Sequence, residues 1–490
     1  MSDTVTLDKI DNLSLFLYFL EPILLVKYHF TLPFYPRNLY LRVKPNFYQK
    51  IYGIIVTFFK KGNNLVFKKI CVLGLGYIGL PTASTFATHG IKVVGIDINE
   101  QILNGLNNGQ LHLYEPGLRT LVQNALHSGN LTVKDEPEDA DAFVIAVPTP
   151  ITKEKKADLS YVKAASKSIT PHLKKGNLVV LESTSPPRTT LDIVAPILEE
   201  SGLQAGKDFY LAYSPERVLP GKILREIIEN TRVIGGINAV SAKAGKELYA
   251  TFVTGEIILT NSSTAEMVKL MENTYRDINI AIANEFTRLA DHFDIDIWEV
   301  IQLANRHPRV NILKPGPGVG GHCISVDPWF LVEAAPDISP LVRTARQVND
   351  SQPAYVVNTI KKNMGELQGK HITALGLAYK PNVDDLRESP AIEVVKLLAK
   401  EGAITKTFEP YKPEASVKGT INCQSFKKAI QDAEIILLLV SHKQFLQLDP
   451  KTICLMTSAK TVIDTTGTWK REQWEQANFH FICLGQNKRP

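Results

Sequence analysis

The sequence predicts an α/β protein in which two doubly wound domains are joined by a central helical connector that contains a long helix. Three observations indicate this architecture. They are a glycine-rich turn between a strand and a helix at 74–79, a helical spacing of apolar residues from about Thr264, and a copy of the first strand and turn at His371. We expect four parts: an atypical extension at 1–66, a dinucleotide-binding domain at 67–262, a central helical domain at 263–365, and a second Rossmann-like domain at 366–490.

The first turn lies in the setting that a dinucleotide-binding loop requires. Lys68–Leu73 is predicted to be a buried strand, Gly74-Leu75-Gly76-Tyr77-Ile78-Gly79 follows, and a helix is expected through Thr88. Gly74 permits the tight turn, Gly76 allows a pyrophosphate to approach the backbone, and Gly79 allows the helix to pack on the strand. The helix N-terminus would stabilise the phosphate charge.

The acidic residue of this motif is also present. A second strand is predicted at Lys92–Ile96 and is followed by Asp97, which would accept hydrogen bonds from the ribose hydroxyls. This favours NAD over NADP as the cofactor. Further strands are predicted at 141–147, 177–181 and 210–213. Thr149 and Thr184 follow two of them and could line the cofactor cleft or serve only as turn residues.

The predicted long helix carries a polar stripe. Lys269, Asn273 and Arg276 recur at helical spacing and therefore share one face, and Ser263 or Thr264 is the expected N-cap. A solvated face is the ordinary explanation of such a stripe. The alternative is a catalytic face, because the stripe lies one helix before a glycine-rich loop that presents a single thiol.

That loop runs from Pro315 to Phe330 and places Cys323 directly after Gly320, Gly321 and His322. Its glycines permit positive φ and close approach of a ligand to the backbone. A small buried cysteine beside a tight turn is the alternative interpretation. Asp327 lies four residues after the thiol.

The copy of the first turn has lost its phosphate-binding geometry. Gly76 is replaced by Ala378 and Gly79 by Pro381, so a second intact dinucleotide site is not expected. Lys380 and Arg387 supply cations that suit a nucleotide diphosphate. Strands are expected to continue this second sheet at 434–440 and 461–464.

Composition excludes several classes of protein. The net charge of +5 is spread along the chain without a basic block, so nucleic acid is not an expected partner. The five cysteines form no C-x-x-C pair, which predicts a reducing, cytoplasmic location with no disulfide and no metal site, and disfavours a zinc alcohol dehydrogenase. The apolar extension 1–66 could be a non-native upstream region, a membrane contact or an accessory packing segment.

These motifs together resemble the UDP-glucose/GDP-mannose dehydrogenase family from about Phe67 to Lys470. Within it, the branch that oxidises UDP-N-acetyl-D-mannosamine is the most similar. The resemblance implies an NAD-binding domain, a central catalytic and dimerisation domain, and a UDP-sugar-binding domain. It also implies a homodimer formed through the central helices. The motifs that carry it are GLGYIGLP, AVPTP, ESTSP, PERVLPG, AEMVKLMENTYRD, NRHPRVNILKPGPGVGGHCISVDPWF and LAYKPNVDDLRESPA.

The family oxidises the C6 hydroxymethyl of a nucleotide sugar to a carboxylate with two NAD and one water, which here implies an aminouronic acid for surface polysaccharide. By resemblance, Cys323 is the nucleophile that forms a thiohemiacetal and then a thioester. Lys269 stabilises oxyanions and shuttles protons, Asn273 assists it, and Asp327 orients Lys269 and the water. Other cofactor positions are matched by Tyr77, Ile78, Asp97, Thr149, Thr184 and Arg387. Substrate positions are matched by Arg217, Val218, Lys269, Asn273, Arg276, His307, Arg309, Gly318, Tyr379 and Lys380.

Two departures from the family pattern bear on the substrate. Pro220 stands where the UDP-glucose branch has a second glutamate, which disfavours UDP-glucose. Lys470 replaces an arginine at a further substrate position and keeps the charge without bidentate phosphate recognition. Three alternatives stay open: the same reaction on UDP-N-acetylglucosamine or another N-acetylhexosamine, a two-electron hydroxyacid dehydrogenase, and a non-catalytic protein that binds NAD or a nucleotide sugar.

Overall fold

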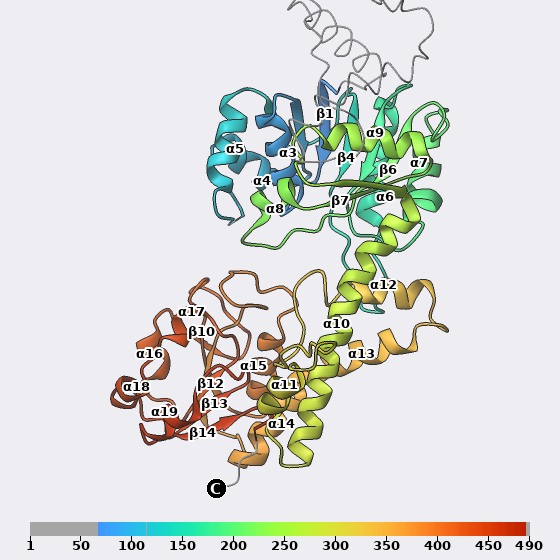
Figure 1. Cartoon of the computed structure of the whole chain (residues 1–490). Coiled ribbons are helices and arrows are strands. Elements are labelled where there is room, and N and C mark those ends of the chain that lie inside the picture. The colour runs from blue at the N-terminus through green and yellow to red at the C-terminus, as the bar shows by residue number, and fades with distance from the viewer. Residues whose placement is uncertain (1–66, 114, 487–490) are drawn as a thin grey trace, which may run out of the picture. The chain divides into compact units, whose positions relative to one another are not determined.

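The structure is a computed structural model that describes residues 67–113 and 115–486 (Figure 1). The alternatives for the extension at 1–66 concern residues outside this description. In the described part, no helix is both long enough and apolar enough to cross a membrane.

The first sheet has eight strands in the order β3-β2-β1-β4-β5-β6-β7-β8. Neighbouring strands are parallel except β6 and β7, which are antiparallel. This confirms the doubly wound fold expected from the first turn. The strands are β1 (Lys69–Leu73), β2 (Lys92–Ile96), β3 (Leu131–Lys134), β4 (Ala142–Ile145), β5 (Leu178–Leu181), β6 (Tyr210–Tyr213), β7 (Arg232–Gly236) and β8 (Ile257–Asn261). The helices between them are α3 (Gly79–Thr88), α4 (Glu100–Asn107), α5 (Leu118–His127), α6 (Ser160–Ile169), α7 (Ala195–Glu199), α8 (Ile223–Glu229) and α9 (Ala239–Tyr249).

The central strands β1, β4, β5 and β6 of this sheet are almost fully buried and apolar on both faces. Successive residues of β4 point to opposite faces of the sheet: Phe143 belongs to one hydrophobic cluster and Val144 to the other. Helices must cover both faces of such a sheet, which explains the continuous runs AFVI and LVVL in place of alternating patterns. The carboxyl ends of the strands are thereby left as the accessible edge.

The central part is built on α10 (Ser262–His292), the long helix labelled in Figure 1. Its N-cap is Asn261, whose side chain accepts a hydrogen bond from Thr264 N at 2.8 Å, so the prediction of Ser263 or Thr264 was wrong by two or three residues. Arg346 Nη1 donates to the buried Asp277 at 2.5 Å and joins α13 to α10. The other helices of this part are α11 (Ile297–Ala304), α12 (Asp327–Ala334), α13 (Pro340–Asp350) and α14 (Gln352–Met364).

The second sheet has six strands in the order β11-β10-β9-β12-β13-β14, and all neighbours are parallel. The turn after β9 resembles the turn after β1, because in both a carboxylate accepts a hydrogen bond from the turn backbone. Glu409 Oε2 accepts from Leu377 N at 2.7 Å, as Asp97 Oδ2 accepts from Leu75 N at 2.9 Å. The elements are β9 (His371–Leu375), α15 (Pro390–Lys400), β10 (Ile404–Phe408), β11 (Ile421–Asn422), α16 (Phe426–Ile430), β12 (Ile435–Leu438), α17 (Lys443–Leu446), α18 (Pro450–Met456), β13 (Thr461–Asp464), α19 (Arg471–Glu475) and β14 (His480–Cys483).

Candidate active site

The glycine-rich turn has the geometry that a dinucleotide needs. Gly74 has φ +93°, and a Cβ at Gly79 would lie 1.8 Å from the carbonyl oxygen of Gly74. A Cβ at Gly76 would meet nothing within 4 Å, so the backbone is open on that side. The turn is therefore closed against its own helix and open where a pyrophosphate would approach. Tyr77 and Ile78 are half-buried beside it.

Polar residues at neighbouring strand ends complete this edge of the sheet. Asp97 is held after β2 because Oδ1 accepts from Asn99 N at 2.9 Å and Oδ2 accepts from Leu75 N. Ser183 Oγ donates to the carbonyl of Val147 at 2.7 Å and so joins the segments that follow β4 and β5. Thr149 and Thr184 are half-buried in these two segments.

The thiol loop is packed closely against the loop after β9. A Cβ at Gly321 would lie 2.8 Å from the Tyr379 ring, and one at Gly320 would lie 2.4 Å from the carbonyl oxygen of Glu388. Gly318, at φ +138°, is equally constrained, because a Cβ there would lie 2.9 Å from Pro390. These contacts explain why the sequence needs several glycines just before Cys323.

The thiol loop ends at Val326, four residues before the predicted end at Phe330, because α12 begins at Asp327. Lys269, Asn273 and Asp327 gather at this end of the loop. The N–H of Asp327 donates to the carbonyl of Cys323 at 2.8 Å, and Asn273 Nδ2 donates to Asp327 Oδ2 at 2.5 Å. Lys269 Nζ donates to the backbone carbonyl of Glu216 at 2.7 Å. The stripe on α10 is thus directed into a polar site.

The environment of the site disfavours the ionised forms of Cys323 and Asp327. Burial, and then the neighbouring Asp327 carboxylate, raise the pKa of the Cys323 thiol to about 11, although Lys269 and Arg387 act in the opposite direction. Burial raises the pKa of Asp327 to about 6, while Lys269 and the hydrogen bond from Asn273 lower it. Cys323 is therefore a neutral thiol in the free protein at pH 7.

A buried ion network behind Lys269 was not predicted from the sequence. Arg232 donates to Glu216 Oε2 at 2.9 Å, to Ser214 Oγ at 2.9 Å and to Glu182 Oε1 at 3.3 Å. Tyr249 donates to the same Glu182 oxygen at 2.5 Å. Burial raises the pKa of Glu182 to about 7. The motifs ESTSP and PERVLPG contain both carboxylates, but no local pattern indicates that they share one arginine.

Several predicted substrate residues surround the same region. Lys380 Nζ lies 3.5 Å from the carbonyl oxygen of Pro220 and 5.5 Å from the centre of the Tyr379 ring. Arg217 forms an ion pair with Glu272 of α10 at 2.6 Å, and its neighbour Val218 is half-buried. Arg276 is exposed and is close enough to Lys380 to lower the pKa of that lysine, after the larger effect of burial.

The remaining predicted residues lie at the surface. His307 and Arg309 are exposed after α11, where the Arg309 N–H donates to His307 Nδ1 at 3.4 Å. Lys470 is exposed at the start of α19. The adjacent Arg471 does not take the place of the missing arginine, because its guanidinium donates to the carbonyls of Phe481 and Gln486 at 2.9 and 3.2 Å.

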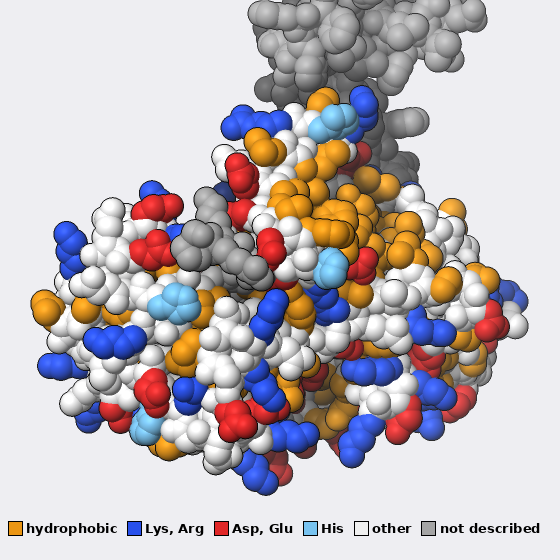
Figure 2. Space-filling view, turned by 90° about the horizontal axis from the view of Figure 1, so that it is seen from below, with side chains coloured by type: hydrophobic (Ala, Val, Ile, Leu, Met, Phe, Trp, Pro, Cys, Tyr) orange, Lys and Arg blue, Asp and Glu red, His pale blue; other side chains and the backbone are white. Residues whose placement is uncertain are grey.

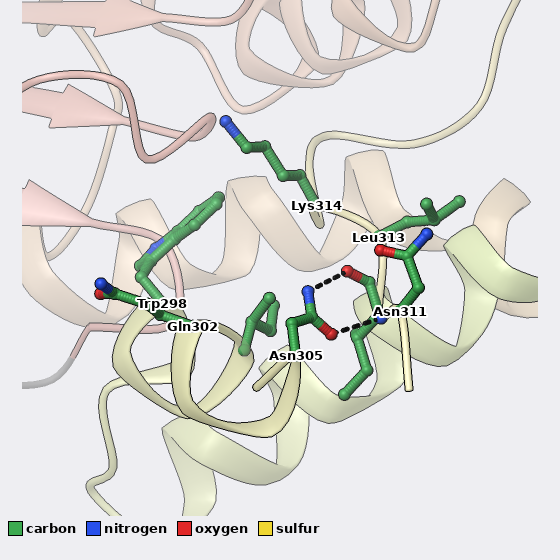
Figure 3. Close-up of a pocket in the computed structure, with 8 residues that line it drawn as sticks. Trp298, Gln302, Asn305, Asn311, Leu313 and Lys314 are labelled. Atoms are coloured by element: carbon green, nitrogen blue, oxygen red, sulfur yellow. Dashed lines mark hydrogen bonds between the residues drawn. The ribbon is translucent and has the colours of Figure 1, made fainter. Parts of the chain in front are cut away.

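A cavity of about 420 Å³ lies elsewhere, beside α11 (Figure 3). Asn305 closes one side of it by two hydrogen bonds to the backbone of Ile312, at 2.7 and 3.0 Å. None of the predicted site residues lines this cavity. Its lining consists of Trp298, Ile301, Gln302, Asn305, Asn311, Ile312, Leu313 and Lys314.

Comparison with known proteins places most of the described chain in one family. The NAD-binding domain of the UDP-glucose/GDP-mannose dehydrogenase family matches residues 68–253, its central domain matches 263–351, and its UDP-binding domain matches 373–471. The three matches include the glycine-rich turn, the α10 stripe with the thiol loop, and the loop after β9.

Individual relatives are similar over nearly their full lengths. A UDP-N-acetyl-D-mannosamine dehydrogenase of Methanocaldococcus jannaschii is 49% identical, over 88% of this chain and 99% of that protein. An NDP-N-acetyl-D-galactosaminuronic acid dehydrogenase of Ralstonia solanacearum is 46% identical, over 83% of this chain and 97% of that protein.

The solved structures give the same assignment. The UDP-N-acetyl-mannosamine dehydrogenase of Staphylococcus aureus matches with a TM-score of 0.79 and 44% identity, over 86% of this chain and 99% of that one. These similarities cover both sheets and the thiol loop between them. The chain therefore belongs to the UDP-glucose/GDP-mannose dehydrogenase family and is an NAD-dependent nucleotide-sugar dehydrogenase.

Proposed function

We propose that this protein is a UDP-N-acetyl-D-mannosamine 6-dehydrogenase that makes the corresponding uronate for surface polysaccharide. The reaction converts a C6 hydroxymethyl and one water into a carboxylate, with reduction of two NAD. The observation that carries the proposal is the arrangement of the site, in which Asp327 is bonded to the Cys323 carbonyl and to Asn273, and Lys269 is fixed on Glu216. The names of relatives in Methanocaldococcus jannaschii and Staphylococcus aureus support the choice of sugar.

The cofactor would lie along the open side of the turn at 74–79, with the ribose at Asp97. When bound, NAD accepts a hydride from the sugar carbon in each of the two oxidations. We assign further cofactor contacts to Tyr77, Ile78, Thr149, Thr184 and Arg387.

Lys269 has the central role in proton transfer. As a neutral amine it would take the C6 hydroxyl proton as the aldehyde forms, and the resulting ammonium would donate a hydrogen bond to the oxygen at C6. Asn273 would donate to the same oxygen. Because Lys269 is held by a neutral carbonyl and not by a carboxylate, its charge is available to an oxyanion.

Cys323 makes the second oxidation possible. Its sulfur would bond to C6 of the aldehyde while the thiol proton passes to the C6 oxygen, which gives a thiohemiacetal. The thiohemiacetal becomes a thioester when the second hydride leaves and the C6 hydroxyl proton leaves through Lys269. Water would then hydrolyse the thioester, with Asp327 as the orienting and proton-accepting carboxylate. Since the pKa of Cys323 is raised to about 11 in the free protein, the thiol proton must leave within the substrate complex.

The substrate would bind with its diphosphate between Lys380, Arg217 and Arg276. We propose that Val218, Gly318 and Tyr379 contact the nucleotide sugar, and that Lys470 reaches its phosphates. The corresponding parts of the chain are an NAD domain at 67–262, a central domain at 263–365 and a UDP-sugar domain at 366–490. We propose a cytoplasmic location, because a reducing compartment keeps a catalytic thiol reduced.

A second candidate is the same reaction on another N-acetylhexosamine. The relative named for N-acetyl-D-galactosaminuronic acid, at 46% identity, favours keeping this alternative. The epimers differ only in the direction of ring hydroxyl or amide groups, so the reacting residues would be unchanged.

The active unit is proposed to be a homodimer formed through α10. Six exposed hydrophobic residues of this helix and its C-cap Phe293 recur at spacings of three, four and seven, which places them on one stripe. On the face drawn in Figure 2, hydrophobic side chains gather in one area. His307 and Arg309, exposed after α11, would then reach the partner's site. The stripe consists of Met267, Met271, Tyr275, Ile282, Phe286, Leu289 and Phe293.

NADH yield on a panel of nucleotide sugars tests the proposal. The panel contains UDP-N-acetylmannosamine, UDP-N-acetylglucosamine, UDP-N-acetylgalactosamine, UDP-glucose and GDP-mannose. Two NADH for each UDP-N-acetylmannosamine, with a carboxylate product, is the expected result. Two NADH from another sugar would keep the chemistry and change the substrate, whereas one NADH per sugar would remove the role of Cys323.

A further inference from the structure

Four side chains from three loops meet beside the thiol. They are Tyr77 of the glycine-rich turn, His322 of the thiol loop, and Asp385 and Arg387 of the loop after β9. The Tyr77 and His322 rings are stacked with centroids 6.5 Å apart and planes at 30°. The Arg387 guanidinium lies 5.1 Å from the centre of the Tyr77 ring.

Arg387 is bonded to the thiol loop twice. Its carbonyl accepts from Gly321 N at 3.1 Å, and its Nη2 lies 3.0 Å from His322 Nδ1. Asp385 orients the same guanidinium by accepting from Nε at 2.9 Å and from Nη2 at 2.7 Å. The arginine therefore has a defined direction with respect to the histidine.

These contacts determine the tautomer of His322. A guanidinium can only donate, so Nδ1 is the acceptor and the proton of the neutral ring is on Nε2. Partial burial, followed by the charge of Arg387, lowers the pKa of His322 to about 4, so the ring is neutral at pH 7. His322 thus offers Arg387 a neutral acceptor that keeps the full cationic charge of the guanidinium.

We propose that His322 is a positioning residue for cofactor binding, because its Nδ1 holds the Arg387 guanidinium against the Tyr77 ring. This inference rests on the cofactor contacts proposed above for Tyr77 and Arg387. Since His322 adjoins Cys323, the same contact links the proposed cofactor site to the nucleophile. The affinity for NAD should depend on His322, whereas the affinity for the nucleotide part of the sugar should not.

Three substitutions separate the hydrogen bond from the ring contact. His322→Asn keeps an acceptor close to the position of Nδ1 but removes the ring. His322→Phe keeps a ring beside Tyr77 but removes the acceptor, and His322→Ala removes both. The His322 and Arg387 side chains are 35% and 48% exposed, so these changes do not open the core. Exposed His480→Ala serves as the matched control.

The test measures dissociation constants for NAD and, separately, for UDP by titration calorimetry on the full chain, together with the melting temperature. We expect His322→Ala and His322→Phe to weaken NAD binding about tenfold, and His322→Asn to stay within about twofold of the unsubstituted protein. UDP binding should be unchanged in all three. Because these binding measurements need no turnover, they can be interpreted even if UDP-N-acetylmannosamine is not the substrate.

Three results would overturn the inference. The first is unchanged NAD affinity in His322→Ala with the fold intact. The second is equal loss of NAD and UDP affinity, which would indicate a general structural role. The third is rescue by phenylalanine but not by asparagine, which would assign the effect to ring stacking and not to the bond with Arg387.

Discussion

Lys269 Nζ donates a hydrogen bond to the backbone carbonyl of Glu216 at 2.7 Å, and the side chain of the same glutamate accepts from Arg232 at 2.9 Å. The position of the lysine ammonium therefore depends on a buried arginine one step away. Arg232 lies between two carboxylates, Glu216 and Glu182, and all three are nearly inaccessible to solvent.

Substitution Arg232→Met should destabilise the protein by about 3–5 kcal/mol, because it leaves two buried carboxylates without a counter-ion. Urea denaturation at pH 8 measures this loss. Arg225→Met is the control, since Arg225 pairs with Glu229 on an exposed surface and its loss should change the free energy of unfolding far less. Equal effects of the two substitutions would contradict the assignment of Arg232 to a buried network.

Alkylation of Cys323 should report its raised pKa. Burial, and then Asp327, raise this pKa to about 11, so about one thiol in a thousand is ionised at pH 8. In the free protein, the rate of carbamidomethylation at Cys323 should rise about tenfold per pH unit between pH 7 and 10. Mass spectrometry of the Cys323 peptide measures the rate, and Cys323→Ser provides the blank. A rate that levels off near pH 7 would show that the thiolate is already stable without substrate.

Asp327→Asn should abolish turnover and yet stabilise the fold. Because the folded-state pKa of Asp327 is raised to about 6, its ionisation destabilises the folded protein above that pH and has no effect below about 4. The substitution should therefore raise the free energy of unfolding at pH 8 by up to about 3 kcal/mol, and the gain should vanish at pH 4. The control substitution Asp135→Asn, at an exposed residue, should change the free energy of unfolding by less than about 0.5 kcal/mol. A loss of stability at pH 8 would contradict the pKa assignment.

Much of this architecture could be predicted from the sequence because its signals are local. The strands β2, β6 and β13 have the predicted bounds, and the period of α10 brings Lys269 and Asn273 to one face. The degenerate turn at Ala378 follows from a comparison with the first turn. Each of these inferences needs only residues that are neighbours in the chain.

The missed features depend on contacts between distant segments. Arg232 joins carboxylates that lie 16 and 50 residues away, and His322 meets an arginine 65 residues further on. The cap of α10 is a different kind of error: Ser263 and Thr264 are good capping residues, but Asn261 lies where β8 ends and so begins the helix earlier.

Asp97→Ser should weaken the preference for NAD over NADP. The carboxylate is fixed beside the turn by hydrogen bonds from Leu75 N and Asn99 N, and there it would repel a 2′-phosphate and bind the ribose hydroxyls. We expect the ratio of kcat/KM for NAD to that for NADP to fall by at least about tenfold, which corresponds to about 1.4 kcal/mol. The exposed Asp135→Ser should leave the ratio unchanged. An unchanged ratio in Asp97→Ser would mean that other residues discriminate between NAD and NADP.

The apolar stripe of α10 predicts the oligomeric state. Met271 and Tyr275 are 56% and 72% exposed in the isolated chain, although they lie on the helix that carries Lys269 and Asn273. The double substitution Met271→Glu/Tyr275→Glu should convert a dimer to a monomer, because two copies of the helix would then place like charges against each other. Light scattering after size exclusion measures the mass. Leu455→Glu, at a residue 89% exposed on α18, should leave the dimer intact. A dimer that survives the double substitution would require a different interface, and His307 and Arg309 would then lose their proposed route to the partner's site.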